Sequence, residues 1–168
     1  MRNTLKAVML TDLTGYTAFS AGATRTDLAA AIRQQKRIIE PAIRTHHGRI
    51  VKLMGDGVLV EFASAVDAVD CAVELQGAMF SSNADLPEER RIVLRVGINL
   101  GDVMVEGSDL YGDGVNIAAR LEALAHLEAL HRVRQDHRGL ALVLHGRAVG
   151  RVVLPHVVPA AAERLQLL

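Results

Sequence analysis

Two aspartates stand where short apolar runs end or pause, and their positions suit phosphate or metal chemistry. Asp12 follows the apolar run 7–10, and Asp56 lies between the apolar runs 50–54 and 58–62. If the strands that carry them are neighbours, the two carboxylates converge and repel unless a cation lies between them. Mg²⁺ and Mn²⁺ accept a few carboxylates together with phosphate oxygens from a substrate. Taken alone, the pair is equally well explained as solvated strand ends, with Asp56 as a turn residue.

A polar pair further along the chain could act on the same phosphates. Asn116 and Arg120 are four residues apart, so on a helix they project from the same face. A guanidinium and an amide together stabilise charge on a phosphate. The spacing alone slightly favours an ordinary polar helix edge, so the pair needs support from the rest of the chain.

The apolar pattern predicts the elements that must bring these side chains together. Gly55, Asp56 and Gly57 form a turn signal between two apolar runs, so we expect a hairpin with an acid at its tip. Ser64 is expected to cap a helix, and Pro41 to end or kink another. In chain order the expected elements are a strand over 7–10, a helix over 27–43, the hairpin over 50–62, a helix over 65–79, strands over 92–98 and 103–105 joined near 99–102, and a helix over 115–124.

This order of elements predicts the α+β class. It matches a ferredoxin-like split βαβ core, with an antiparallel or mixed sheet and helices packed on one face. A chain of 168 residues is long enough for one domain with a substantial core. We expect residues 1–125 to form this domain, because the composition changes after them.

Composition excludes several classes of protein. Half of the residues are apolar and the formal net charge is zero, which excludes a disordered tail and a nucleic-acid binder that relies on bulk positive charge. Cys71 is the single cysteine and lies in an apolar stretch, so we expect it in the core without a disulfide. No stretch approaches the length of a membrane span, and we expect a cytoplasmic protein.

Residues 126–168 differ in character from the rest. They hold five of the seven histidines and six arginines, but no lysine and no aromatic residue. The apolar runs 140–144 and 152–158 could add strands to the sheet, although Pro155 and Pro159 would confine them to edges or ends. One hypothesis for the abrupt change is a translated frameshift or a truncated gene. The sequence therefore does not define how this segment completes the fold.

Four stretches of the chain together resemble a known family. They are TDLTGYT at 11–17, KLMGDG at 52–57, RVGINLG at 95–101 and DLYGDGVNIAAR at 109–120. In this order and with this spacing they are similar to the successive motifs of the class III nucleotide cyclase catalytic domains. The similarity covers residues 5–125. Each motif is weak alone, but the four in order are highly specific together.

The resemblance assigns the polar residues to the parts of a nucleotide site. Asp12 and Asp56 match the aspartates that bind two Mg²⁺ or Mn²⁺ ions, and Arg95 matches an arginine that contacts phosphate. Asn116 and Arg120 match the pair that orients the ribose and stabilises the transition state. The loop that covers the triphosphate is matched by Leu13, Thr14, Gly15, Tyr16 and Thr17.

Lys52 and Asp109 match the two residues that read the purine base. Adenine presents an N1 acceptor beside an N6 donor, so a lysine with an aspartate complements its edge, whereas guanine presents the opposite pattern. Guanylate cyclases typically place glutamate and cysteine at these positions. The resemblance therefore implies ATP as the substrate.

The resemblance implies an adenylate cyclase that acts as a dimer. The ribose 3′-hydroxyl would attack the α-phosphorus with two metal ions assisting, which yields cyclic AMP and pyrophosphate. A head-to-tail homodimer with two shared active sites is also implied. Asp12, Asp56 and Arg95 would come from one chain, and the base-reading and helix residues from the other.

The chain departs from the family pattern after the fourth motif. The family carries a later lysine that reaches the triphosphate, and here no lysine follows Lys52. A catalytically inactive nucleotide-binding or dimerisation module is therefore the alternative, and an unfolded remnant is a third reading. ATP binding without turnover would distinguish the inactive module from a cyclase.

Overall fold

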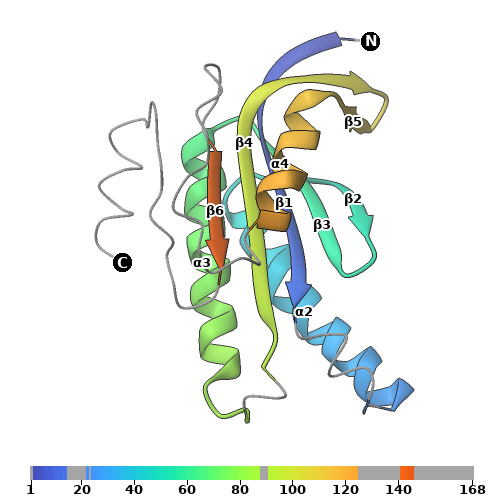
Figure 1. The fold of residues 1–168 in the computed structure, drawn as a ribbon, viewed down its shortest axis with the longest axis vertical. Coiled ribbons are helices and arrows are strands. Elements are labelled where there is room, and N and C mark those ends of the chain that lie inside the picture. Colours follow the sequence, from blue (N-terminus) through green and yellow to red (C-terminus); the bar gives the residue numbers. More distant parts are fainter. Residues whose placement is uncertain (1, 15–21, 23, 88–90, 125–140, 146–168) are drawn as a thin grey trace.

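The computed structural model describes residues 2–14, 22, 24–87, 91–124 and 141–145. The elements in chain order are β1 (Arg2–Thr14), α2 (Arg25–Thr45), β2 (Arg49–Met54), β3 (Gly57–Phe62), α3 (Ala65–Asn83), β4 (Val93–Glu106), β5 (Asp109–Tyr111), α4 (Asp113–Leu124) and β6 (Ala141–His145). Figure 1 shows the strands side by side as one curved sheet, with helices in front of it and behind it.

The six described strands form one sheet, and all of their pairs are antiparallel. The strand order is β2-β3-β1-β4-β5, and β6 also pairs with β4. Because β3 lies between β1 and β2, the first six elements form the split βαβ arrangement that the sequence predicted. The α+β class is confirmed.

Two hydrophobic clusters cover opposite faces of the sheet. Ala7 and Met9 of β1 belong to a cluster with α2 and α3, whereas Val8 and Leu10 belong to a second cluster with Ala118 of α4. Successive strand residues point to opposite faces, so covering both faces explains why the run is apolar without alternation. The prediction that the helices pack on one face holds for α2 and α3. α4 packs on the other face (Figure 1).

β4 is one long strand, and the expectation of two strands joined near 99–102 is wrong. Asn99 is compatible with a turn, but its buried side chain donates from Nδ2 to the carbonyl oxygen of Gly114 at 3.2 Å. Its polar group is therefore satisfied by α4 rather than by a turn. The hairpin comes later, between β4 and β5, where Gly107 has a φ of 60° that suits the first position of a type II′ turn.

The helices lie where the sequence predicted but extend further. Ser64 caps α3, because its Oγ accepts a hydrogen bond from the Asp67 N–H at 3.3 Å. α3 continues beyond Met79 to Asn83, and α2 continues past Pro41. None of the described helices combines the length and the apolar character that a membrane crossing requires.

Cys71 of α3 lies in the core, as expected. Burial raises the pKa of its thiol to about 12. The thiol is therefore neutral at physiological pH and contributes to packing.

Within residues 126–168 the structure describes β6 alone. Its residues 141–145 pair with residues 95–99 of β4, on the side of β4 away from β1. Part of the apolar run at 140–144 thus extends the sheet. The run at 152–158 lies outside the described residues.

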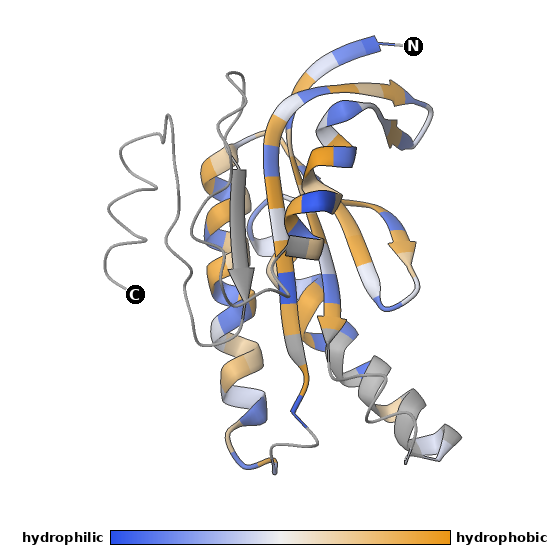
Figure 2. Ribbon diagram, in the orientation of Figure 1, coloured by the Kyte–Doolittle hydropathy of each residue, from blue (hydrophilic) through white to orange (hydrophobic). Residues whose placement is uncertain are grey.

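The sheet curls so that its two outer strands approach each other. β2 and β5 stand at opposite ends of the strand order, yet they are in contact. The curl encloses the cluster beside α4, which includes Leu59 of β3, Val103 and Leu110. Figure 2 shows that β3 is apolar along most of its length, as such an enclosed strand must be. The curl brings side chains of two different hairpins to one edge of the molecule.

Candidate functional site

Asp56 lies at the tip of the β2–β3 hairpin, as the sequence predicted. Met54 pairs with Gly57, so the turn consists of Gly55 and Asp56, and Gly55 takes the positive φ of 65°. The Asp-Gly pair is therefore not the centre of the turn, and Gly57 serves another purpose. A Cβ at Gly57 would lie 2.3 Å from the carbonyl oxygen of Thr11, so only glycine lets β3 begin this close to β1.

The close approach of β3 to β1 brings Asp12 and Asp56 together. Val58 stands opposite Thr11 in the register and donates its N–H to Thr11 Oγ1 at 3.2 Å. Asp12 follows Thr11 at this end of the sheet, beside the hairpin tip. Burial, and next the negative charge of Asp12, raise the pKa of Asp56. The convergence of the two carboxylates that the sequence predicted is observed.

Arg95 approaches this pair of carboxylates from β4. It stands directly opposite Asp12 in the β1–β4 register, and its Nη2 forms an ion pair with Asp12 Oδ2. The Arg95 Nε lies 2.8 Å from Oε1 of Glu122, which comes from α4. We call Asp12, Asp56, Arg95 and Glu122 the carboxylate cluster.

Glu122 is the member of the carboxylate cluster that was not predicted from the sequence. Its side chain is 10% exposed. Burial raises the pKa of Glu122, Arg95 opposes the rise, and the charges of Asp12 and Asp56 add to it. The signal in the sequence was its spacing: Glu122 is four residues after the buried Ala118, so it lies on the packed face of α4. An acid at such a position requires a cationic partner.

Gly97 allows α4 to carry Glu122 into the cluster. A Cβ at Gly97 would lie 2.4 Å from the carbonyl oxygen of Ala118 and 2.4 Å from the backbone nitrogen of Glu122. Backbone atoms cannot yield as a flexible side chain can. The direct contact of α4 with β4 therefore depends on the absence of a side chain at this position.

The carboxylate cluster fits a divalent cation. Its three carboxylates outnumber its single guanidinium, and burial, followed by the neighbouring carboxylate charges, raises the pKa values of Asp56 and Glu122. In the described part of the chain, no group of three or more His, Cys, Asp or Glu side chains is arranged to hold a metal ion by itself. Mg²⁺ does not need such a cage, since one or two carboxylates suffice when a substrate supplies phosphate oxygens. Asp12 and Asp56 are the residues that could hold the ion.

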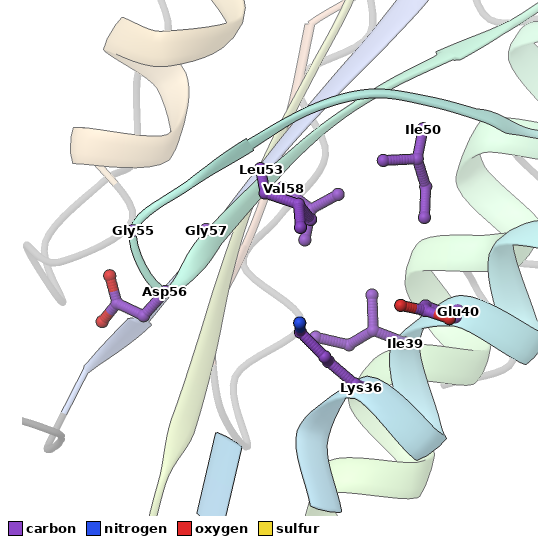
Figure 3. Close-up of a pocket in the computed structure, with 9 residues that line it drawn as sticks. All are labelled: Lys36, Ile39, Glu40, Ile50, Leu53, Gly55, Asp56, Gly57 and Val58. Carbon is purple, nitrogen blue, oxygen red and sulfur yellow. The ribbon is translucent and has the colours of Figure 1, made fainter. Parts of the chain in front are cut away.

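A cavity of about 120 Å³ lies behind the hairpin, and Asp56 is the member of the carboxylate cluster that also lines it. Its lining includes Lys36 and Ile39 of α2 together with Ile50 and Leu53 of β2. Figure 3 shows the carboxylate of Asp56 pointing away from these α2 side chains. The cavity therefore belongs to the α2 face of the sheet, whereas Glu122 approaches from the α4 face.

Lys52 and Asp109 meet at the edge where β2 approaches β5. Lys52 Nζ lies 3.6 Å from Asp109 Oδ2, and the same carboxylate accepts hydrogen bonds from the Leu110 N–H at 2.9 Å and the Tyr111 hydroxyl at 3.0 Å. These hydrogen bonds, and then the charge of Lys52, lower the pKa of Asp109. The Lys52 side chain is 57% exposed, so the pair is open to a ligand. The part played by Tyr111 was not anticipated from the sequence.

Asn116 and Arg120 are not gathered with either group in one chain. Both side chains are exposed on α4. Within the described residues, no hydrogen bond or ion pair joins them to the carboxylate cluster or to the Lys52–Asp109 pair. Their predicted role in binding the ribose and the phosphate therefore stays a prediction.

The segment predicted to cover a triphosphate is described only at its start. Leu13 is buried in the core with α2 and α3, and Thr14 is the last residue of β1. These two positions are therefore part of a strand rather than of a loop, because β1 pairs with β4 over its whole length. Gly15, Tyr16 and Thr17 lie outside the described residues.

Comparisons with known proteins agree with one another. Residues 3–151 match the family model described as the adenylate and guanylate cyclase catalytic domain. "Putative adenylate cyclase 3" of Rhizobium meliloti is 53% identical over 125 residues, which are 74% of this chain and 21% of that protein. "Adenylate cyclase" of Streptomyces coelicolor is 31% identical over 124 residues, which are 74% of this chain and 31% of that protein. The chain thus spans about a fifth to a third of the length of these curated relatives.

A solved structure carries the same fold. The adenylate/guanylate cyclase/hydrolase from Silicibacter pomeroyi superposes with a TM-score of 0.67 at 41% sequence identity. The match covers 73% of this chain and 72% of that one. The sequence and the backbone of this chain are therefore both similar to those of nucleotide cyclase catalytic domains.

Proposed function

Because the chain belongs to the adenylate and guanylate cyclase catalytic domain family, we propose that it converts ATP into 3′,5′-cyclic AMP and pyrophosphate. The observation that carries this proposal is the approach of Asp12 on β1 and Asp56 in the turn before β3, the neighbouring strand. Two crowded carboxylates at the open end of a sheet suit a divalent cation with a polyphosphate. Cyclases of this family generally depend on divalent metal ions.

The Lys52–Asp109 pair supports ATP rather than GTP as the substrate. A cationic donor beside a carboxylate acceptor complements the N1 and N6 positions of adenine. Guanine would place its N1–H donor against the Lys52 ammonium and its O6 acceptor against the Asp109 carboxylate, and these polar groups would remain unpaired. The names of the two curated relatives, both adenylate cyclases, support the same choice.

The metal ions would be held by Asp12 and Asp56 and would supply charge neutralisation and a lowered pKa for the ribose 3′-hydroxyl. The side chains of the protein bind and orient the nucleotide around this centre. Asn116 would align the ribose, and Arg120 would offset the charge that develops on the α-phosphate, an effect of about 3 kcal/mol for a preorganised donor. The 3′-oxygen would then form its bond to the α-phosphorus as the bond to pyrophosphate breaks, and the hydroxyl proton would pass to water.

We place each active site between two chains in a head-to-tail homodimer. Asn116 and Arg120 are exposed on α4, and among the described residues no hydrogen bond or ion pair joins them to the carboxylate cluster of their own chain, so in this proposal a partner chain receives them at its triphosphate. The Lys52–Asp109 pair forms within one chain and would accompany them. One chain would thus supply the metal centre, and its partner the base and ribose contacts.

Mixing two inactive variants tests the shared site. Asp56→Asn removes a metal ligand and Arg120→Ala removes a charge near the phosphate, so each variant alone should lose about 10²-fold or more in cyclic AMP formation. In an equimolar mixture, heterodimers contain one intact site, so about a quarter of the wild-type activity should return. Folded variants that do not complement each other would contradict a site shared between chains.

A second candidate function is a nucleotide-binding module without turnover. The observation that favours it is the engagement of Arg95 by both Asp12 and Glu122, which occupies a side chain predicted to contact phosphate. No lysine follows Lys52 in the chain. Calorimetric binding of ATP with Mn²⁺, without cyclic AMP from the same dimeric sample, would establish this candidate in place of the cyclase.

A further inference from the structure

The β2 strand contains an irregularity immediately before Lys52. Ile50 stands opposite Val60 of β3, but Lys52 stands opposite Leu59, so Val51 is an extra residue in the ladder. Such a β-bulge changes the direction of the side chains around it. Bulges often occur next to functional sites, where they aim a particular side chain.

The bulge directs two consecutive side chains, those of Val51 and Lys52, toward the face of the sheet beside α4. Ile50 and Leu53 both line the cavity beside α2 (Figure 3), whereas Val51 packs in the cluster beside α4. In a regular strand Lys52 would alternate with Val51 and face α2. Instead, Lys52 reaches Asp109 on β5, the strand whose Leu110 packs in the cluster beside α4.

Arg49 links the two hairpins that carry Lys52 and Asp109. Its Nε donates to Glu61 Oε1 at 2.7 Å, and its Nη1 donates to the carbonyl oxygen of Ser108 at 3.1 Å. Glu61 belongs to β3, with a side chain 12% exposed, so it anchors the guanidinium to the sheet. Ser108 directly precedes Asp109 in the β4–β5 turn. One planar side chain thus connects the sheet to the backbone beside Asp109.

This link matters because the sheet itself does not hold β2 against β5. The two strands stand at opposite ends of the strand order and share no ladder. Among the described residues, the polar contacts between these two edges are Arg49 with Ser108 and Lys52 with Asp109. If the contact of Arg49 with Ser108 is lost, no other polar contact between these described strands holds Lys52 and Asp109 at their present distance.

We propose that Arg49 is a positioning residue that sets the separation of Lys52 and Asp109, and thereby the purine selectivity of the site. The selectivity part rests on the proposed function, while the positioning part concerns geometry alone. Arg49 does not touch the nucleotide in this account. It acts through the β4–β5 turn, by holding the Asp109 carboxylate within reach of the lysine that the bulge has aimed.

Two substitutions separate the bridge from the charge. Arg49→Met removes both hydrogen bonds, whereas Arg49→Lys keeps a cation beside Glu61 but has a single nitrogen that cannot span to Ser108 as well. Arg44→Met is the matched control, because it removes an exposed arginine from an ion pair with Glu40 of 3.2 Å. Arg44 lies on α2 and has no link to β5.

Carbodiimide coupling in the full chain measures the positioning directly. The reagent activates the Asp109 carboxylate, Lys52 Nζ displaces it to form an amide, and the reagent leaves as its urea with the carboxylate oxygen. Peptide mass spectrometry then gives the yield of the Lys52–Asp109 link within one chain. We expect the yield to fall about fivefold in Arg49→Met, because the hydrogen bond to Ser108, the one that reaches the β4–β5 turn, is lost. The yield should stay unchanged in Arg44→Met. An unchanged yield in Arg49→Met would overturn the proposal.

Selectivity is measured as the ratio of kcat/KM for ATP to that for GTP, or as the ratio of binding constants if the chain does not turn over. Both Arg49 variants should lower the ratio about fivefold, through a higher KM for ATP with kcat nearly unchanged. Arg49→Lys should lower this ratio while its melting temperature stays at the wild-type value. If Arg49 had a purely structural role, the ratio would not change without a change in the melting temperature. A lowered coupling yield with an unchanged ratio would overturn the selectivity role. A lowered yield in a chain without cyclase activity would support positioning and refute the proposed function instead.

Discussion

The carboxylate cluster and the Lys52–Asp109 pair handle charge in opposite ways. In the cluster, partly buried acids outnumber a single arginine, and the pKa values of Asp56 and Glu122 are raised. In the pair, one acid meets one base at an exposed edge, and hydrogen bonds lower the pKa of Asp109. The cluster therefore carries unbalanced charge that a divalent cation would neutralise, whereas the pair is balanced before a ligand arrives. The difference supports our proposal that the first region carries the chemistry and the second selects the substrate.

Neutralising one acid of the carboxylate cluster should have the largest effect on activity. Asp56→Asn should lower cyclic AMP formation by about 10²- to 10³-fold, because a metal contributes several kcal/mol to catalysis. The same change should not lower the melting temperature of the metal-free protein, since it relieves crowding with Asp12. Asp85→Asn, at an exposed acid after α3, is the control and should leave activity unchanged. Activity within about threefold of wild type in Asp56→Asn would contradict the assigned chemistry.

Exchanging the Lys52–Asp109 pair should change selectivity more than rate. Lys52→Glu combined with Asp109→Cys presents the pattern that guanine complements, so the ATP-to-GTP ratio of kcat/KM should fall by about 10- to 100-fold. Steady-state kinetics with both nucleotides give this ratio. If both substrates lost activity equally, the pair would have a structural rather than a selective role.

Two glycine substitutions test whether the carboxylate cluster depends on the direct contact of α4 with β4. Gly97→Ala forces a Cβ against the α4 backbone that carries Glu122, so we expect a loss of about 1–3 kcal/mol and a lower melting temperature. Gly77→Ala in α3 meets no atom within 4 Å and should stabilise the protein by about 0.5–1 kcal/mol through helix propensity.

Carbodiimide coupling of Lys52 to Asp109 should survive in both variants, because neither glycine lies near that edge. A stable Gly97→Ala protein with full activity would show that α4 need not rest on β4 for the cluster to work.

The pH dependence of stability gives the smallest expected effect. Asp56 and Glu122 have folded-state pKa values above the unfolded values of about 4, so the folded chain binds more protons just above that pH. The contribution of these groups to the free energy of unfolding therefore falls as the pH rises through this window. Thermal melts of metal-free protein should show a shallower fall in Asp56→Asn than in wild type. Identical slopes would mean that the crowding of the carboxylates does not affect folding.

Much of the fold follows from local patterns, and the exceptions have a common cause. The hairpin around Asp56, the Ser64 cap and the helix carrying Asn116 depend on neighbours in sequence, and the structure shows each of them. The sequence wrongly predicted two strands in place of β4, because asparagine is common in turns. The side chain of Asn99 instead donates to the carbonyl oxygen of Gly114 on α4, and the sequence does not show that α4 packs beside this part of β4.

The candidate site was predictable only where motifs or strand ends indicate it. Asp12 and Asp56 could be paired because each follows or interrupts an apolar run that predicts a strand, although β1 continues past Asp12 to Thr14. Arg49, Tyr111 and Glu122 escaped prediction because their partners are set by strand register and by the curl of the sheet. Such contacts join residues far apart in the chain, so no local spacing reports them.

The proposal that the chain is an adenylate cyclase is tested by incubating the purified chain with equimolar ATP and GTP and Mn²⁺, and resolving the cyclic nucleotides by chromatography. We expect cyclic AMP as the main product, with cyclic GMP lower by about tenfold or more. The products should disappear together in Asp56→Asn. A folded, dimeric wild-type sample that forms no cyclic AMP, or forms mainly cyclic GMP, would contradict the proposal.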